Sequence, residues 1–301
     1  MGATDAILDG PDYPAPAKLN LFLHVVGRRP DGYHLLQTAF RFVEFGDTLR
    51  FRVRNDGAIV RVAGLADVAP EQDLALRAAR ALQAEARTRL GADIEVVKRL
   101  PVGGGLGGGS SDAATTLLVL NRLWKTGLQR PVLMRLGLNL GADVPVFVFG
   151  QSAFAEGIGE VLTPIRVAPA HYLVATPPVG VSTTAVFSDA GLTRNTKPIK
   201  LAAFYAAGRV DFSACRNDLQ PVVVARYPAV AQALEWLGQF GPARMSGSGS
   251  SVFLGFESRQ AAERVWRKRP PGMQGFVAQG VDDHPLYDQW TRETLGSRQA
   301  G

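Results

Sequence analysis

The chain has 301 residues, of which 46% are hydrophobic, so it can bury a substantial core in one large domain or in two of ordinary size. Its apolar runs stay below the roughly 18 residues of a membrane-spanning helix, and its N-terminus carries acids where a signal peptide carries basic residues. These features argue against a helical membrane protein and favour a cytoplasmic protein, which we expect to have two domains.

The first segments of the chain show the alternation of β-strands. In 19–26 (LNLFLHVV), apolar and more polar residues alternate, which places the polar ones on one face. Segments 38–45 and 48–54 also alternate, and the short connection at Gly46–Asp47 predicts that they pair as an antiparallel hairpin. The chain is therefore expected to begin as a sheet.

Helices and a further strand are predicted next. Alanine, leucine and arginine recur at helical spacing over 71–90, before Gly91. Segment 93–100 (DIEVVKRL) has the composition of a strand, and a second helix is expected over about 131–140, where Gly141 ends it. The first part of the chain therefore combines a sheet with helices.

A glycine cluster lies between the strand and the helices. Segment 101–112 (PVGGGLGGGSSD) has six glycines in seven positions, a costly arrangement unless the backbone must turn tightly or approach another group. After the glycines, Ser110 or Ser111 can cap a helix that runs to about Trp124. The motif is therefore strand, loop, helix.

The segment LGADVPVFVFG follows the second helix. Pro145 is expected to keep Val144 out of helical geometry, so Asp143 lies on an irregular turn. Beyond about residue 160, strands and helices mix without repeats or low-complexity linkers, which indicates a second α+β domain. Its expected strands lie near 171–176, 243–246 and 251–256, and its expected helices near 217–238 and 257–268.

The glycine cluster suits an anion. A glycine-rich turn that opens a helix presents free backbone N–H groups and the positive end of the helix dipole, so phosphate fits, with a tight structural turn as the alternative. The net charge of +6 also favours an anionic partner, such as nucleic acid, a membrane surface or a phosphorylated compound. A dinucleotide-binding fingerprint needs an acidic residue about 20 residues after its glycines to bind ribose, and no acid occurs between Asp112 and Asp143. A Walker A loop needs a Gly-Lys pair, and the chain has none.

The segment PVGGGLGGGSSDAA resembles the phosphate loop of the GHMP kinases, the superfamily of galacto-, homoserine, mevalonate and phosphomevalonate kinases. This loop is the second of three motifs that occur here in the order of the superfamily: PAPAKLNLFL (14–23) resembles the first and RMSGSGSSVF (244–253) the third. The resemblance implies an α+β two-domain GHMP kinase fold. It consists of an N-terminal ribosomal-protein-S5-domain-2-like domain (1–162) that binds ATP and a C-terminal ferredoxin-like α/β sandwich domain (163–301) that binds substrate.

Within the superfamily, RRPDGYHLLQT, LGADVPVF and AEGIGE complete a pattern that resembles the diphosphocytidyl-methylerythritol kinases, over about residues 15–280. The resemblance implies ATP-dependent phosphorylation of the 2-hydroxyl of 4-diphosphocytidyl-2-C-methyl-D-erythritol, in the methylerythritol phosphate route to isoprenoid precursors. Two alternatives stay open. One is another small-molecule kinase of the superfamily, and the other is a basic RNA-binding protein, against which the scattered arginines argue.

The resemblance implies Lys18 and Asp143 as the catalytic pair. A carboxylate within hydrogen-bond reach can accept the proton of a sugar-alcohol hydroxyl, and a nearby lysine would favour the ionised carboxylate and offset charge on the phosphoryl group. A surface lysine and a helix-capping aspartate are the alternatives. Because phosphoryl transfer is often loose, positioning can matter more than proton removal.

Four residues are expected to bind the substrate. Asn20 shares a strand face with Lys18, so it would bind substrate or orient the lysine, with a polar residue at a strand edge as the alternative. The resemblance implies Tyr33 and Phe187 as stacking partners of the cytosine and His34 as a hydrogen-bonding reader of the base. Core packing is the alternative for both aromatic residues, and the segment around Phe187 departs from the longer family pattern.

The resemblance also implies ATP and Mg²⁺, although the sequence shows neither a carboxylate cage nor a zinc-ligand spacing, so no metal ligand is named. Ser110 and Ser111 could cap the helix, touch phosphate, or help hold magnesium through water. The lone Cys215 is expected to be packed in the interior. Small molecules are the expected partners, with no nucleic acid or membrane. The expected ATP-binding residues are Pro101, Val102, Gly103, Gly104, Gly105, Leu106, Gly107, Gly108, Gly109, Ser110 and Ser111.

Overall fold

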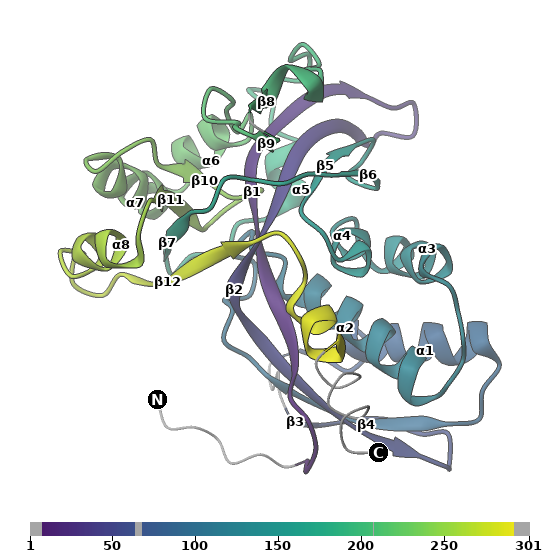
Figure 1. The fold of residues 1–301 in the computed structure, drawn as a ribbon. Helices are drawn as coiled ribbons and strands as arrows, with labels where there is room; N and C mark the ends of the chain where they lie inside the picture. Colours follow the sequence, from purple (N-terminus) through teal and green to yellow (C-terminus); the bar gives the residue numbers. More distant parts are fainter. Residues whose placement is uncertain (1–7, 64–67, 207, 292–301) are drawn as a thin grey trace.

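Two long strands form the centre of the molecule. The computed structural model describes residues 8–63, 68–206 and 208–291, and in it β1 (Tyr13–Arg28) pairs antiparallel with β2 (His34–Arg54) along almost their whole length (Figure 1). Residues 15–25 of β1 are buried without interruption, so its polar face is buried as well as its apolar one. Polar side chains on this strand therefore need partners inside the protein.

Ten strands of the described residues form one sheet, of which seven follow the order β10, β11, β7, β12, β2, β4, β3. β1 and β5 (Ala153–Glu156) also pair with β2, and β6 (Val161–Pro164) pairs with β5. β3 and β4 are parallel, and the other pairs of this sheet are antiparallel. The other strands of this sheet are β3 (Ile59–Ala63), β4 (Gly91–Val97), β7 (His171–Thr176), β10 (Arg244–Met245), β11 (Val252–Phe256) and β12 (Gln274–Val281). Two short strands, β8 (Tyr205–Ala206) and β9 (Arg209–Val210), pair separately.

Helices cover the two ends of this sheet. α2 packs against α1, α3, α4 and β1, whereas α8 packs against β7, β11 and β12 (Figure 1). No helix in the described ranges is long and apolar enough to cross a membrane. The helices are α1 (Leu74–Ala86), α2 (Gly108–Leu123), α3 (Arg130–Leu140), α4 (Val144–Phe149), α5 (Thr183–Phe187), α6 (Gln220–Arg226), α7 (Pro228–Gly238) and α8 (Arg259–Trp266), with a 3₁₀ turn at Leu201–Phe204.

Strand β1 contributes to three clusters of buried side chains. Ala15 belongs to the cluster under α1 and α2, Leu19 to a central cluster, and Leu23 to the cluster under α6 and α7. Burial of apolar area stabilises a protein by roughly 25 cal/mol per Å², so each cluster fixes the strand in place independently. The side chains at the middle of β1 are therefore held rigidly between the two ends of the molecule.

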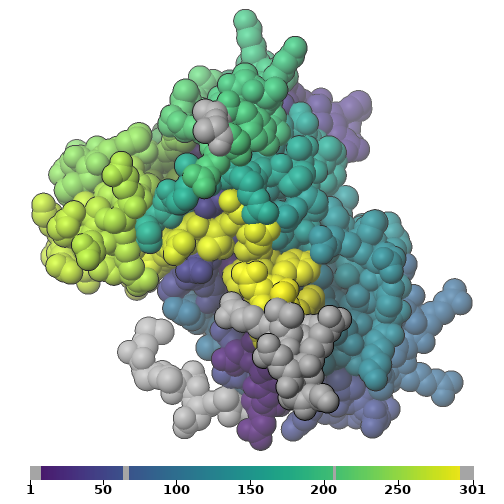
Figure 2. Space-filling model, in the orientation of Figure 1, coloured from purple at the N-terminus to yellow at the C-terminus, as the bar shows by residue number. Residues whose placement is uncertain are grey.

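The C-terminal part of the chain returns to the first part. β12 pairs with β7 and also, through Gly280 and Val281, with β2. Beyond it, Leu286 is buried in the cluster under α1 and α2, and Tyr287 donates its hydroxyl hydrogen to the carbonyl of Val148 at 3.0 Å. Figure 2 shows these yellow residues lying between the green and the teal parts of the surface. The domain boundary at 162/163 stays a prediction.

The hairpin predicted at Gly46–Asp47 is wrong. β2 runs through both residues as one strand, and the pairing with β1 shifts register between Pro16 and Ala17, opposite Gly46. A Cβ at Gly46 would lie 2.1 Å from the carbonyl oxygen of Ala15. This glycine is therefore required by the close approach of two strands at a bulge, and not by a turn.

Two predicted helix boundaries are also wrong. α1 ends at Ala86, well before Gly91, because Arg87 adopts a left-handed conformation with φ of 51°. Val144 does not lie outside helical geometry but begins α4. Pro145 is tolerated there because it occupies the first turn, where a backbone N–H has no helical acceptor.

Most other predicted elements are confirmed. α3, α8, β7, β10 and β11 lie within one or two residues of the expected ranges. The helix expected over 217–238 is two helices, α6 and α7, which meet at Tyr227 because Pro228 begins the second one. Strand β12 and the short helix α5 were not predicted.

Candidate active site

The glycine cluster forms a loop that runs directly into α2. The helix begins at Gly108 with Gly107 as its N-cap residue, in a left-handed conformation with φ of 73°. The predicted capping by Ser110 or Ser111 is therefore wrong, since both lie inside the helix. Glycine allows this early start because it has no Cβ. Among the described residues, no side chain caps the first backbone N–H groups of α2, so they are open to a ligand.

Close backbone contacts hold the loop against the second half of the chain. The hydroxyl of Ser246 donates to the carbonyl of Gly105 at 2.9 Å, and the backbone N–H of Ser251 donates to the carbonyl of Gly104 at 3.0 Å. A Cβ at Gly105 would lie 2.2 Å from the carbonyl oxygen of Ser246. The second and third motifs of the sequence thus meet with no room for a side chain between them.

Lys18 joins the first motif to this loop and to Asp143. Its backbone N–H donates to the carbonyl of Leu106 at 2.9 Å, and a Cβ at Gly107 would lie 3.1 Å from its Cε. Its Nζ lies 3.1 Å from Oδ2 of Asp143 and donates to Oδ1 of Asn20 at 2.5 Å. The lysine side chain is only 3% exposed, whereas that of Asp143 is 37% exposed. A buried cation therefore faces a carboxylate that solvent or a ligand can reach.

The structural alternatives for these three residues do not hold. Lys18 is not a surface lysine, and Asp143 occupies the N-cap position of α4 without making a side-chain capping bond. Asn20 is buried rather than at a strand edge. Its Nδ2 donates to the hydroxyl of Thr38 at 2.9 Å, and its backbone N–H donates to the hydroxyl of Ser246 at 3.1 Å. Asn20 thereby fixes its Oδ1 toward the lysine.

A cavity of about 880 Å³ opens beside this group, within the size range of small-molecule sites. Each predicted catalytic or substrate-binding residue lines it, including the distant Phe187 of α5. The predicted ATP-binding residues line it as well, except Leu106 and Ser111, which are fully buried. The sequence motifs therefore converge on one cavity.

Aromatic side chains gather in one part of the cavity wall. The rings of His34 and Phe187 pack with their centroids 5.0 Å apart and their planes tilted by 32°. Tyr33, next in the chain, is 61% exposed and can reach a ligand. Nε of Arg194 donates to Nε2 of His34 at 3.2 Å. No pattern in the sequence marks Arg194, which lies 160 residues from its partner His34.

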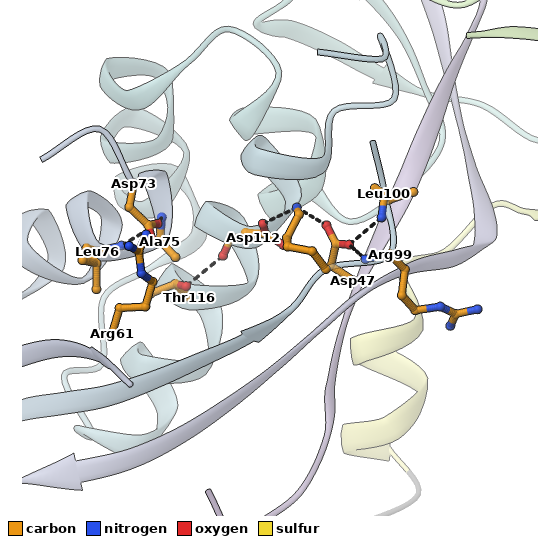
Figure 3. A network of polar contacts seen from close by, with 10 residues as sticks. Asp47, Arg61, Asp73, Ala75, Leu76, Arg99, Leu100, Asp112 and Thr116 are labelled. Atoms are coloured by element: carbon orange, nitrogen blue, oxygen red, sulfur yellow. Dashed lines mark hydrogen bonds and ion pairs between the residues drawn. The ribbon is translucent and has the colours of Figure 1, made fainter. Parts of the chain in front are cut away.

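A buried ionic network lies beside the glycine loop at the start of α2. Nζ of Lys98 donates to Oδ2 of Asp112 at 2.8 Å and also to Asp47, which accepts from the backbone N–H groups of Arg99 and Leu100 (Figure 3). Burial raises the pKa of Asp112 to about 7, against the opposing effect of the Lys98 charge. Lys98 and Asp112 both line the cavity. The lysine offsets two carboxylates that would otherwise repel each other and a phosphate.

Two further observations concern metal binding and the lone thiol. Among the described residues, no group of three or more histidine, cysteine or acidic side chains is arranged to hold a metal ion. Cys215 is buried, as predicted, and burial raises the pKa of its thiol.

Two family models match the chain in sequence order. The model of the GHMP kinases N terminal domain matches residues 73–151, and the model of the GHMP kinases C terminal matches residues 200–270. Homoserine kinase from Cytophaga hutchinsonii has the same fold, with a TM-score of 0.65 at 16% identity over 94% of this chain and 98% of that one. The fold and the site therefore define the class, a GHMP kinase, as predicted.

Relatives of higher identity narrow the class to one family. The chain is 59% identical to the 4-diphosphocytidyl-2-C-methyl-D-erythritol kinase of Thiobacillus denitrificans and 56% identical to that of Aromatoleum aromaticum, over 92% and 91% of this chain and 97% and 95% of the relatives. A crystal structure of 4-(cytidine 5'-diphospho)-2C-methyl-D-erythritol kinase matches with a TM-score of 0.76 at 31% identity, over 90% and 99% of the two chains. The chain belongs to the family of 4-diphosphocytidyl-2-C-methyl-D-erythritol kinases. It is an ATP-using kinase of a small molecule, and the predicted family is confirmed.

Two glycines of the loop provide a matched test of the close approach. Gly103 and Gly105 have nearly the same φ, 71° and 73°, but a Cβ at Gly103 would meet nothing within 4 Å. Gly103→Ala should lower the free energy of unfolding by about 1 kcal/mol, the cost of a left-handed alanine. Gly105→Ala should lower it by about 3 kcal/mol or more, because its Cβ also meets the carbonyl of Ser246. Urea unfolding of both variants measures the difference, and equal losses would contradict the tight contact.

Proposed function

We propose that this kinase transfers the terminal phosphoryl group of ATP to the 2-hydroxyl of 4-diphosphocytidyl-2-C-methyl-D-erythritol, the alcohol for which its relatives are named. The observation that supports this best is that one cavity contains the glycine loop, the Lys18–Asp143 pair and the His34–Phe187 ring pair. The loop suits the phosphates, the Lys18–Asp143 pair suits the reacting hydroxyl, and the ring pair suits the cytosine. Both ligands are small molecules, so the proposal requires neither nucleic acid nor membrane, and it places the reaction in the cytoplasm.

The ATP phosphates would lie against the loop from Gly103 to Gly109. α2 is 16 residues long, and its uncapped N-terminus offers N–H groups and the positive end of a helix dipole. The space beside Gly103 is open, since a Cβ there would meet nothing within 4 Å. Lys18 adds a full positive charge close to Gly107, where the transferred group would carry its developing charge.

Asp143 is the proposed acceptor of the hydroxyl proton. Lys18 binds its Oδ2, so Oδ1 is the oxygen left to face the substrate hydroxyl. The hydroxyl oxygen would form a bond to the terminal phosphorus as the bond to the bridging oxygen of ATP breaks, and the proton would pass to Oδ1. Asn20 keeps the lysine in place, because its Oδ1 accepts from Nζ. Lys18 and Asn20 also position the hydroxyl for an in-line approach.

The cytosine would stack on Tyr33 and Phe187, and His34 would hydrogen-bond to its edge. Aromatic stacking on a base is worth about 1 to 3 kcal/mol, which is enough to anchor the substrate remote from the reacting hydroxyl. Such remote binding energy holds the hydroxyl in position for the chemical step. The pocket therefore contributes to rate as well as to affinity.

Magnesium is proposed as the companion of ATP. Bound with the nucleotide, Mg²⁺ neutralises charge on the phosphate oxygens. The donor set fits a weakly held ion of this kind, because the half-buried hydroxyl of Ser110 lines the cavity at the first turn of α2. Ser110 would hold the ion directly or through water, and phosphate oxygens and water would complete its shell.

The substrate proposal is tested by comparing four alcohols at equal concentration. The purified enzyme with ATP and Mg²⁺ should consume ATP with 4-diphosphocytidyl-2-C-methyl-D-erythritol and not with galactose, homoserine or mevalonate. The aromatic part of the cavity would be left empty by the last three. ATP consumption is followed by a coupled assay, and the product by ³¹P NMR. Preference for one of the simpler alcohols would contradict the proposal.

The roles of Asp143 and Lys18 predict a specific pattern of rates. Asp143→Asn keeps the shape but removes the charge, so ATP binding should survive and the rate of phosphoryl transfer should fall by about 10² to 10⁴-fold. Lys18→Met should also slow this step, and the double variant should lose less than the product of the two losses, because the pair acts as a unit. Single-turnover quench-flow measures the step. A folded Asp143→Asn enzyme with near-normal rates would exclude Asp143 as base.

The base pocket predicts a selective loss of substrate affinity. Tyr33→Ala should weaken binding of the diphosphocytidyl alcohol by about 5-fold or more while changing ATP affinity by less than about 2-fold, because one stacking face is lost. Tyr205→Ala is the matched control, since Tyr205 is also exposed but does not line the cavity. Calorimetry with each ligand measures both constants. Equal weakening of the two ligands would show that Tyr33 does not act on the base.

A further inference from the structure

We propose that Arg194 is a positioning residue for the base pocket. It fixes the tautomer of His34, so that Nδ1 carries the ring proton and presents it to the base as a hydrogen-bond donor. This inference rests on the proposed function, because it concerns the pocket assigned there to the cytosine.

Each nitrogen of the Arg194 guanidinium has a partner. Nε donates to Nε2 of His34 at 3.2 Å, and Nη1 donates to the carbonyl of Leu192 at 3.2 Å. Nη2 donates to the carbonyls of Phe187 at 3.0 Å and of Asp189 at 2.6 Å. The guanidinium does not line the cavity but lies behind its wall. It thereby connects His34 of β2 to Phe187 at the end of α5 and to Asp189 in the turn that follows.

The chemistry of the pair sets the position of the ring proton. A guanidinium stays charged and can only donate, so Nε2 of His34 must accept and cannot carry a hydrogen. A neutral imidazole whose Nε2 is bare carries its hydrogen on Nδ1. Burial lowers the pKa of His34, and the charges of Arg194 and Arg28 lower it further, which favours the neutral ring. No described residue accepts a hydrogen bond from Nδ1, which leaves this donor to a ligand in the cavity.

A fixed donor selects a base by the edge that the base presents. Cytosine has acceptors at O2 and N3, whereas uracil carries a hydrogen at N3, so a donor directed at N3 favours cytosine. A hydrogen bond that the wrong base cannot make leaves a buried polar group unpaired, which discriminates more strongly than shape does. Without Arg194 the imidazole could move its proton to Nε2 and accept at Nδ1, and the preference would be lost.

A merely structural role can be separated from this one. Arg194 also holds the turn 187–192, so its loss could disturb Phe187 without any effect through His34. Arg226 offers the matched control, because its Nη2 lies 2.5 Å from Oδ2 of Asp189 in the same turn and makes no contact with His34. Arg226→Met therefore removes a guanidinium from the turn and leaves the histidine partner in place.

The first test is the ¹⁵N NMR of the histidine rings in the ligand-free, full-length enzyme. The chain has four histidines, and His34→Asn identifies the signals of His34. Wild type and Arg226→Met should show a protonated Nδ1 and a bare Nε2 at pH 7.5, and Arg194→Met should show a shift toward protonated Nε2. A wild-type ring protonated on Nε2, or an Arg194→Met ring unchanged from wild type, would overturn the proposal. This test needs no substrate.

The second test measures binding of CMP, UMP and ATP by calorimetry. Arg194→Met should weaken CMP about 10-fold, with UMP and ATP changed by less than about 2-fold, and Arg226→Met should change CMP by less than about 2-fold. His34→Asn keeps a donor at the position of Nδ1, so adding Arg194→Met to it should cause little further loss. Because Arg194→Met removes a positive neighbour, the pKa of His34 should rise. A protonated ring donates from Nδ1 again, so CMP binding by this variant should recover in part as the pH falls.

The outcomes separate the two levels of the argument. Equal losses of CMP affinity in Arg194→Met and Arg226→Met would show that Arg194 acts only on the turn and would overturn its positioning role. A wild-type enzyme with the expected tautomer but no CMP binding would overturn the base pocket of the proposed function, and with it the presentation of the donor to a base. Selective loss in Arg194→Met together with the tautomer change supports both.

Discussion

The whole site depends on the contact between two glycine-rich loops. Gly105 lies so close to the carbonyl oxygen of Ser246 that a Cβ would approach it to 2.2 Å, and Gly249 lies on the other side of the same contact. This contact brings the start of α2, which is proposed to bind phosphate, from the first half of the chain against the third motif from the second half. The contact combines a backbone hydrogen bond with one from the hydroxyl of Ser246, and its close approach depends on glycine.

Strand β1 places the proposed catalytic pair beside this contact. It shares the three clusters of buried side chains, and at its middle Lys18 bonds to the loop through its backbone and to Asp143 through its ammonium group. A buried ammonium is unfavourable unless it is paired, and Asn20 and Asp143 supply the pairing. The residues proposed for phosphoryl transfer are thus also residues that pair the buried polar groups of the strand.

The sequence was informative where chemistry requires fixed residue types at fixed spacing. A phosphate loop needs bare backbone at the start of a helix, so 103–109 could be assigned to it, and the motif pattern then indicated Lys18 and Asp143, which the structure brings to 3.1 Å of each other. Periodicity was less informative about glycine. At Gly46 the pattern predicted a turn, whereas the glycine is required by the close approach of two strands. A glycine between two strand-like segments is expected in both cases, so the sequence does not distinguish them.

Contacts between residues that are distant in the chain could not be found in the same way. Asp47 and Asp112 meet through Lys98, and Arg194 meets His34, only because the sheet places β2 beside β4 and the turn after α5 beside the start of β2. In both cases a cation already holds the polar group that faces the cavity. Ligand binding then needs little reorganisation of these charges, which is the condition under which fixed dipoles and charges stabilise a transition state most. The fold therefore supplies part of the electrostatic arrangement of the cavity, and two cations that supply it, Lys98 and Arg194, lie outside the motifs of the sequence.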